Sequence, residues 1–163
     1  ESIEISGPAG FDLTGWQIVL YNGNGGVVYN TRRLTETIPA TCGTDGVVVA
    51  TYPVDGIQNG SPDGIALVRP NGTVAEFLSY EGGMTGVGGP ADGIAATDIG
   101  VLEGTATPVG QSLQLVNGIW TGPAIDTARC TGLLAMRILT PFSDEISIES
   151  TEDSSTISMS FFR

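Results

Sequence analysis

Turn-forming residues interrupt this chain about every ten residues, and this spacing constrains its fold more than any other feature. The runs between the turns are rich in Val, Ile, Thr and aromatic residues, whereas helix signals are almost missing. Gly, Asn and Pro supply the turns, and 24 of the 163 residues are glycine. Short β-prone runs with such boundaries are typical of antiparallel sheets. The sequence therefore predicts an all-β domain, a sandwich or barrel of about seven to nine short strands.

Two β-hairpins are the clearest local predictions, because each has an Asn-Gly pair at its turn. An Asn-Gly pair readily adopts the positive φ angles that a tight reversal needs. The hairpins join residues 64–69 to 73–80 and residues 112–116 to 119–121. Further strands are expected at residues 2–6, 16–21, 27–30 and 46–50.

Two other segments carry more specific expectations. Residues 46–50 read Gly-Val-Val-Val-Ala, which is apolar enough for a strand that is buried on both faces. Residues 82–110 are rich in Gly, Ala, Thr and Pro. They are expected to form long surface loops with at most one short helical turn, near residues 91–96.

The C-terminal part, residues 133–163, contains two strictly alternating segments, 146–148 and 157–161. A polar segment, residues 149–155, separates them. Alternation of this kind predicts a β-hairpin, and a disordered acidic tail is the alternative. We therefore expect a sandwich over residues 1–132 and an extension over residues 133–163 that packs on the same domain.

Several ordered segments carry a resemblance to a known family. They are Glu4–Gly10, Asp12–Trp16 with the strand Gln17–Tyr21, Asn22–Gly26, Tyr52–Leu67 and Glu76–Gly82. Over about residues 1–122 the chain resembles the lamin-tail domains, in their bacterial, secreted form. The resemblance implies an immunoglobulin-like sandwich, of a kind often found beside hydrolase domains in exported proteins. It assigns no active site to the domain itself.

The chain departs from this family pattern at both ends. Family members usually carry an earlier strand before the segment that corresponds to Glu4-Ile5, and residues 133–163 have no counterpart. A sheet that lacks one strand has an open edge, which is an aggregation hazard. We therefore expect a strand of the C-terminal hairpin to replace the usual first strand, or to pair with a second copy of the chain.

Charge and composition exclude several functions. The chain has 18 carboxylates against six basic residues, all of them arginine, and its net charge is −12. Binding to nucleic acid depends on Lys and Arg at the phosphates, so it is not expected of this chain by itself. The absence of histidine excludes Ser-His-Asp and Cys-His catalysis and histidine-ligated zinc. No run approaches the ~20 apolar residues of a membrane span. An acidic surface suits an extracellular protein, although simple solubility is the alternative.

The two cysteines, Cys42 and Cys130, lie 88 positions apart and belong to no metal-binding motif. In a secreted or cell-surface protein such a pair is expected to form a disulfide. The ideal loop-entropy stabilisation for such a long loop is about 4–5 kcal/mol. Two free buried thiols are the alternative.

One loop gathers oxygen donors that suit a hard cation. Asp55, Asn59, Ser61 and Asp63 could hold Ca²⁺ together with backbone carbonyls, although the spacing does not match an EF-hand. The alternative is structural, because Asx residues and Gly stabilise turns through bonds from side chain to backbone. Calcium is the one cofactor that the sequence suggests.

Three residues are expected to act structurally. Gly15 permits a sharp entry into the strand that follows, and Trp16 is expected to fill the core where the sheets meet. Trp120 is expected to pack in the core or at an edge. A ring that stacks on a ligand, such as a sugar, is the alternative for either tryptophan.

Together these features predict a non-catalytic extracellular module that binds a protein, a glycan or a cell surface, of the kind that accompanies exported hydrolases. The alternative is a structural protein that assembles with copies of itself through a sheet edge or its C-terminal hairpin. A hydrolase remains a third possibility, but it would need two facing carboxyl groups, one with a raised pKa. No such pair is marked in the sequence.

Overall fold

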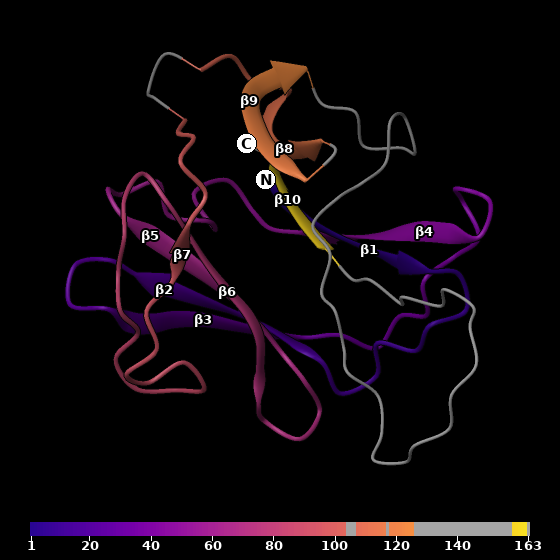
Figure 1. Cartoon of the computed structure of the whole chain (residues 1–163), viewed down its shortest axis with the longest axis horizontal. Coiled ribbons are helices and arrows are strands. Elements are labelled where there is room, and N and C mark those ends of the chain that lie inside the picture. The colour runs from indigo at the N-terminus through magenta and orange to yellow at the C-terminus, as the bar shows by residue number, and fades with distance from the viewer. Residues whose placement is uncertain (104–106, 117, 126–157, 163) are drawn as a thin grey trace, which may run out of the picture.

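The structure, a computed structural model, describes residues 1–103, 107–116, 118–125 and 158–162. These residues form ten β-strands in two five-stranded sheets (Figure 1). They include no helix, and therefore no helical segment long and apolar enough to cross a membrane. The all-β, sandwich-like prediction is confirmed, with more strands than expected because of the very short β7 and the C-terminal β10.

The strands are β1 (Ser2–Pro8), β2 (Gln17–Asn22), β3 (Val27–Arg33), β4 (Asp45–Thr51), β5 (Asp63–Val68), β6 (Val74–Tyr80), β7 (Thr97–Asp98), β8 (Gln111–Val116), β9 (Ile119–Ile125) and β10 (Ser158–Phe162). The first sheet has the order β4-β1-β10-β8-β9, and the second has the order β3-β2-β5-β6-β7. Both predicted hairpins are confirmed, because β5 pairs with β6 and β8 pairs with β9, each antiparallel.

The main core lies between the two sheets. Alternate residues of β1 and β8 in the first sheet and of β2, β5 and β6 in the second contribute to it, as the two-residue period of a strand requires. Fully buried members from these strands include Ile3, Ile5, Ile18, Leu20, Ile65 and Leu67. This arrangement supplies the hydrophobic burial that stabilises a two-layer β fold.

The second sheet is buried on its outer face as well. All six residues of β5 are buried, and a second cluster that includes Tyr21, Phe77 and Ala91 covers the side away from the main core. The Tyr21 hydroxyl accepts a hydrogen bond from the Ala91 N–H at 2.8 Å and donates to the Gly88 carbonyl at 3.2 Å. Residues 82–96 are a largely exposed surface loop without helix, as predicted, and they also pack on the sheet through Ala91; residues 90–93 form a turn.

The prediction that residues 46–50 are buried on both faces is wrong. Strand β4 is an edge strand of the first sheet, and it alternates between buried and exposed positions. Val48 and Ala50 face the core, whereas Val49 is 43% exposed. The three consecutive valines of β4 reflect the high β propensity of valine rather than burial of both faces of the strand.

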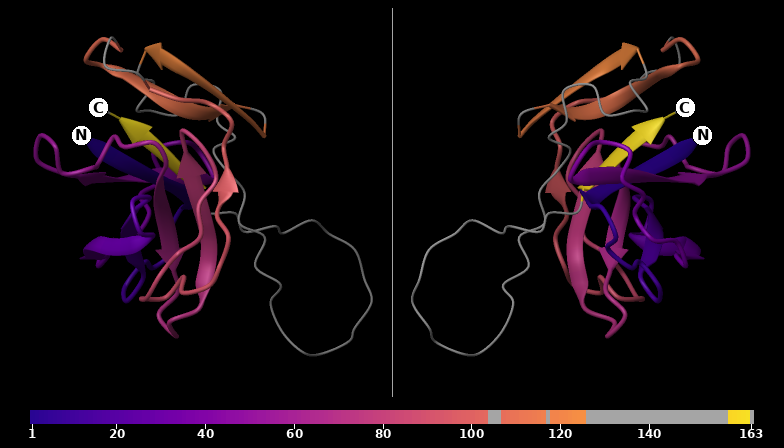
Figure 2. Two further views of the ribbon diagram at one scale, coloured as in Figure 1. Left: turned by 90° about the vertical axis from the view of Figure 1, so that its left-hand side faces the viewer. Right: turned by 90° about the vertical axis from the view of Figure 1, so that its right-hand side faces the viewer.

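The C-terminal strand β10 lies inside the first sheet. It pairs antiparallel with β1 on one side and with β8 on the other. Figure 2 shows β10 beside β1, with both chain ends near one another and the β8–β9 hairpin at one extremity of the molecule. Strand β1 is therefore not an open edge. The other predicted arm of the tail hairpin, residues 146–148, lies outside the described residues.

Candidate functional site

A pocket of about 330 Å³ opens beside the loop that precedes β5. The residues that line it are Glu1, Asn22, Asp55, Ile57, Gln58, Asn59, Gly60 and Asp63. Three of the four residues predicted to hold a cation, Asp55, Asn59 and Asp63, thus line one pocket. The fourth, Ser61, does not line it, and its hydroxyl donates to the Glu81 carbonyl at 2.8 Å. A pocket of this size lies at the small end of the range for ligand sites in proteins.

Asp63 has a structural position in this pocket. Its side chain is 1% exposed. Oδ1 accepts a hydrogen bond from the Gly23 N–H at 3.0 Å, and Oδ2 accepts one from the Gly60 N–H. A buried carboxylate needs such donors, because burial without them would carry a large desolvation cost. The carboxylate therefore ties the loop before β5 to the β2–β3 turn.

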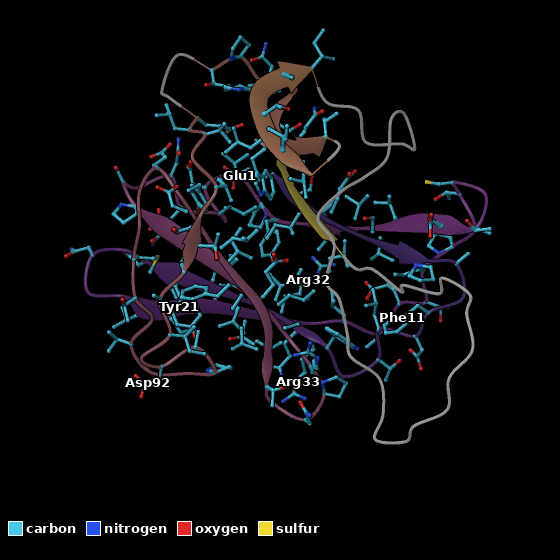
Figure 3. The ribbon with its side chains drawn as sticks, viewed as in Figure 1. Glu1, Phe11, Tyr21, Arg32, Arg33 and Asp92 are labelled. Atoms are coloured by element: carbon cyan, nitrogen blue, oxygen red, sulfur yellow. The ribbon has the colours of Figure 1, made fainter. Side chains whose placement is uncertain are left out.

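The Glu1 carboxylate holds the opposite part of the same loop. Its Oε2 accepts a hydrogen bond from the Ile57 N–H at 2.8 Å, and its Oε1 accepts one from the Asp55 N–H at 3.3 Å. Asp55 has a φ of 60°, a left-handed conformation that Asp tolerates better than most residues. Figure 3 labels Glu1 and draws the described side chains around it.

Two tyrosines, the buried Tyr80 and the partly buried Tyr29, hold the middle of the loop through the peptide groups of Gln58. The Gln58 N–H donates to the Tyr29 hydroxyl at 2.9 Å, and the Tyr80 hydroxyl donates to the Gln58 carbonyl. Burial is the main cause that raises the pKa of Tyr29 to about 12, and the nearby carboxylates of Asp63 and Glu1 are smaller causes in the same direction. Burial is also the main cause that raises the pKa of Tyr80. Both phenols therefore stay protonated at neutral pH and serve as hydrogen-bonding anchors rather than as bases.

The β2–β3 turn and the pocket loop approach each other closely at Gly23. A Cβ atom on this residue would lie 1.7 Å from the Pro62 carbonyl oxygen, so no larger residue fits without movement of the backbone. This contact places Asn22 at the rim of the pocket, next to the Gly23 N–H that Asp63 binds. The pocket wall is thus built from two loops that are joined by packing and by a buried carboxylate.

This arrangement offers hydrogen-bonding groups on a fixed loop. Asp55 and Asn59 are exposed, and the amides of Asn22 and Gln58 are partly so. Ca²⁺ takes six to eight oxygen ligands, whereas both oxygens of Asp63 already accept hydrogen bonds from backbone N–H groups. Within the described part of the chain, no group of three or more His, Cys, Asp or Glu residues is placed to hold a metal ion. The calcium site therefore stays a prediction, now with Asp63 already engaged.

The other residues singled out in the sequence lie away from the pocket. Trp16 is 5% exposed in the main core, and its ring meets that of Phe11 edge-on, with the centroids 5.9 Å apart. Gly15 has a φ of 87°, and a Cβ there would lie 3.2 Å from the Pro70 Cβ. Trp120 is half-buried against the same core. Cys42 lies just before β4, and its expected partner Cys130 lies outside the described residues.

Glu76 is a partly buried acid that does not belong to the pocket. It lies on β6 opposite Leu67 of β5. Its Oε2 is buried and has no hydrogen-bond partner in the described part of the chain. Burial raises the pKa of Glu76 to about 8. The group is therefore mainly a neutral acid at pH 7, but a raised pKa alone does not make a glycosidase, which needs a second carboxyl group across a cleft.

Sequence reasoning missed most of the groups that build the pocket. Glu1, Tyr29 and Tyr80 come from strands or strand ends far from the loop in sequence, and each binds a backbone group of the loop. A tyrosine in a strand is usually a packing residue, so nothing local marks the loop as its partner. The informative signal was the density of Asx and Gly residues between Asp55 and Asp63, which marked the loop that borders the pocket.

Comparisons of this chain with protein-family models, with curated proteins and with solved structures return no match. The lamin-tail resemblance, the secreted location and the Cys42–Cys130 bond accordingly stay predictions.

Proposed function

We propose that this chain is a non-catalytic extracellular binding module of the lamin-tail type, with an immunoglobulin-like sandwich as its scaffold. The ordered segments between Glu4 and Gly82 support the family, and the two-sheet architecture is compatible with it. In this proposal β10 fills the place of the strand that family members carry before the Glu4-Ile5 segment. Its position beside β1 supports that reading.

The observation that carries the proposal is the loop between β4 and β5, which is held in one conformation by side chains from the sheets. Glu1, Tyr29, Asp63 and Tyr80 all bind its backbone groups. A recognition loop on a rigid scaffold loses little conformational entropy when a ligand binds. The same loop borders a concave surface, which is where small ligands bind.

The lining favours a small, polar, uncharged or cationic ligand. Carboxamides from Asn22, Gln58 and Asn59 can both donate and accept hydrogen bonds, and the Asp55 carboxylate accepts them. Ile57 adds an apolar contact. A sugar ring presents hydroxyl groups together with a C–H face and matches this lining, whereas a polyanion would be repelled by a chain of net charge −12.

An array of defined oligosaccharides tests this function. The full chain is expected to bind at least one neutral or amino sugar, and Asn59→Ala and Asp55→Ala are expected to weaken that binding at least tenfold. Asn30→Ala and Asp45→Ala are the matched controls, because both residues are exposed and neither lines the pocket. Binding that survives both pocket substitutions, or no binding to any sugar at millimolar concentration, would refute the proposal.

A titration with Ca²⁺ alone, followed by calorimetry, separates the cation prediction from sugar binding. If Ca²⁺ binds at this loop, Asp55→Ala should abolish the heat signal and Asp45→Ala should leave it unchanged. If the pocket binds sugar without a cation, a chelator should leave sugar binding unaffected. The two outcomes distinguish a calcium-dependent module from a calcium-independent one.

A further inference from the structure

We propose that two copies of this chain exchange β10, so that residues Ser158–Phe162 of one copy complete the first sheet of the other between β1 and β8. The partner is a second copy of this chain, and the exchanged element is a strand already seen in its closed, intrachain position. This inference goes beyond ligand binding at the pocket and does not depend on it.

The place of β10 in the sheet is the first step. Five residues of β10 pair with β1, from Ser2↔Phe162 to Ser6↔Ser158, and two pair with β8. Without β10 the order β4-β1-β10-β8-β9 divides into two separate two-stranded ribbons. Each ribbon would still pack on the second sheet through the main core, but the facing edges of β1 and β8 would lose the strand that joins them. A strand in this position therefore makes the first sheet continuous, whichever copy supplies it.

The chemistry of the contact does not depend on which copy supplies the strand. Strand pairing joins backbone N–H and C=O groups, and these are identical in a second copy of the chain. A strand that leaves its own sheet thus forms the same backbone hydrogen bonds in the sheet of the other copy. Exchange of an identical element is therefore a low-cost route to a dimer. An unfilled position between β1 and β8 would expose two strand edges and would attract any available copy of β10.

The length of the connection lets β10 reach another molecule. Strand β9 ends at Ile125 and β10 begins at Ser158, so the 32 residues at positions 126–157 join them. A connection of that length can span at most roughly 100 Å. A folded chain of this size has a radius of gyration of only about 15 Å. The number of residues in the connection is therefore sufficient for β10 to reach a neighbouring copy.

Protein concentration decides between the closed and exchanged forms. Because β10 belongs to the same chain as its sheet, it is present there at an effective concentration of order 1 mM. Chains at about 10 μM should therefore retain their own β10, and chains near about 1 mM should exchange it to a substantial extent. Molecules concentrated at a surface would fall in the second regime and become linked to one another.

Cross-linking at positions paired in the sheet tests the exchange. Ser6 and Ser158 are Cα partners, and paired strand positions lie within the Cα separation that a disulfide requires. One full chain carries Ser6→Cys and another carries Ser158→Cys. The two are mixed, opened in urea, returned to buffer together at about 10 μM or about 1 mM, and oxidised. Peptide mass mapping under non-reducing conditions distinguishes this link from bonds made by the native cysteines.

Exchange predicts a link between position 6 of one chain and position 158 of the other, with a yield that rises at least severalfold from the lower concentration to the higher. The control mixes Ser6→Cys with Thr97→Cys, which lies in the other sheet, and should give only background. A chain that carries both Ser6→Cys and Ser158→Cys should link within itself at the lower concentration, which also verifies folding. If that chain fails to link, or if the mixed chains match the control at the higher concentration, the proposal is wrong.

Discussion

Replacement of Glu76 by Gln should change how the stability of this protein depends on pH. In the folded chain the buried carboxyl of Glu76 has a pKa of about 8, raised by burial from 4.5. Its Oε2 has no hydrogen-bond partner among the described residues that would favour the charged form. Folding therefore favours the neutral acid, and Glu76→Gln keeps the size of the side chain while removing its ability to ionise.

The magnitude follows from the difference between the folded and unfolded pKa values. Below pH 4.5 the acid is neutral in both states, and its ionisation costs no stability. As the pH rises toward 8, the unfolded state loses its proton first, and folding loses about 1.4 kcal/mol for each pH unit. The upper limit is about 5 kcal/mol above pH 8, and relaxation around the charge should reduce it to about 2–4 kcal/mol. The Gln amide leaves buried polar atoms unpaired, at a cost of about 1 kcal/mol that does not vary with pH.

Urea unfolding of both proteins at pH 5, 7 and 9 measures this difference. Glu76→Gln should be equal to or slightly less stable than the parent chain at pH 5, and more stable by about 1–3 kcal/mol at pH 9, once the cost of the Gln amide is subtracted. Asp45→Asn removes an exposed carboxylate and is the control for a general effect of net charge. Stability curves for Glu76→Gln and the parent that run parallel from pH 5 to pH 9 would refute the reasoning.

Three further substitutions test the contacts that hold the loops. Asp63→Asn replaces one of two acceptor oxygens with an NH₂ group that faces a backbone N–H, and thermal unfolding should report a loss of about 2–3 kcal/mol. Gly23→Ala places a Cβ 1.7 Å from a carbonyl oxygen and should cost about 1–3 kcal/mol or more, whereas Gly83→Ala, with no atom within 4 Å, should be nearly neutral by the same assay. Tyr21→Phe removes the hydroxyl that bonds residues 82–96, so hydrogen exchange should accelerate there before the core strands respond. Unchanged exchange in that segment would show that the hydroxyl does not hold it.

Local sequence patterns were sufficient for the strands and their hairpins. The Asn-Gly turns after Pro70 and after Val116 marked the two reversals that the structure contains, because turn geometry is decided by a few adjacent residues. The alternation in the tail likewise marked β10 as a strand. The run of Asx and Gly residues from Asp55 to Asp63 located the pocket loop for the same reason.

Only the tertiary structure decided which faces are covered and which groups meet. Three successive valines in β4 cannot tell an edge strand from a central one, because burial depends on neighbours that are remote in sequence. The cover over Tyr21 comes from Ala91 in the loop of residues 82–96, whose composition predicted a surface loop but not its packing on the sheet.

The same limit applies to the candidate site and to the tail. The sequence alone determined an acidic, histidine-free, all-β chain with a hydrogen-bonding loop around Asp55 and Asp63. Tertiary structure decided that Tyr29 and Tyr80 hold this loop, and that β10 lies between β1 and β8 rather than at an edge. The physical reason is that turns and strand periodicity depend on local backbone preferences, whereas sheet order and loop anchoring depend on contacts between distant segments.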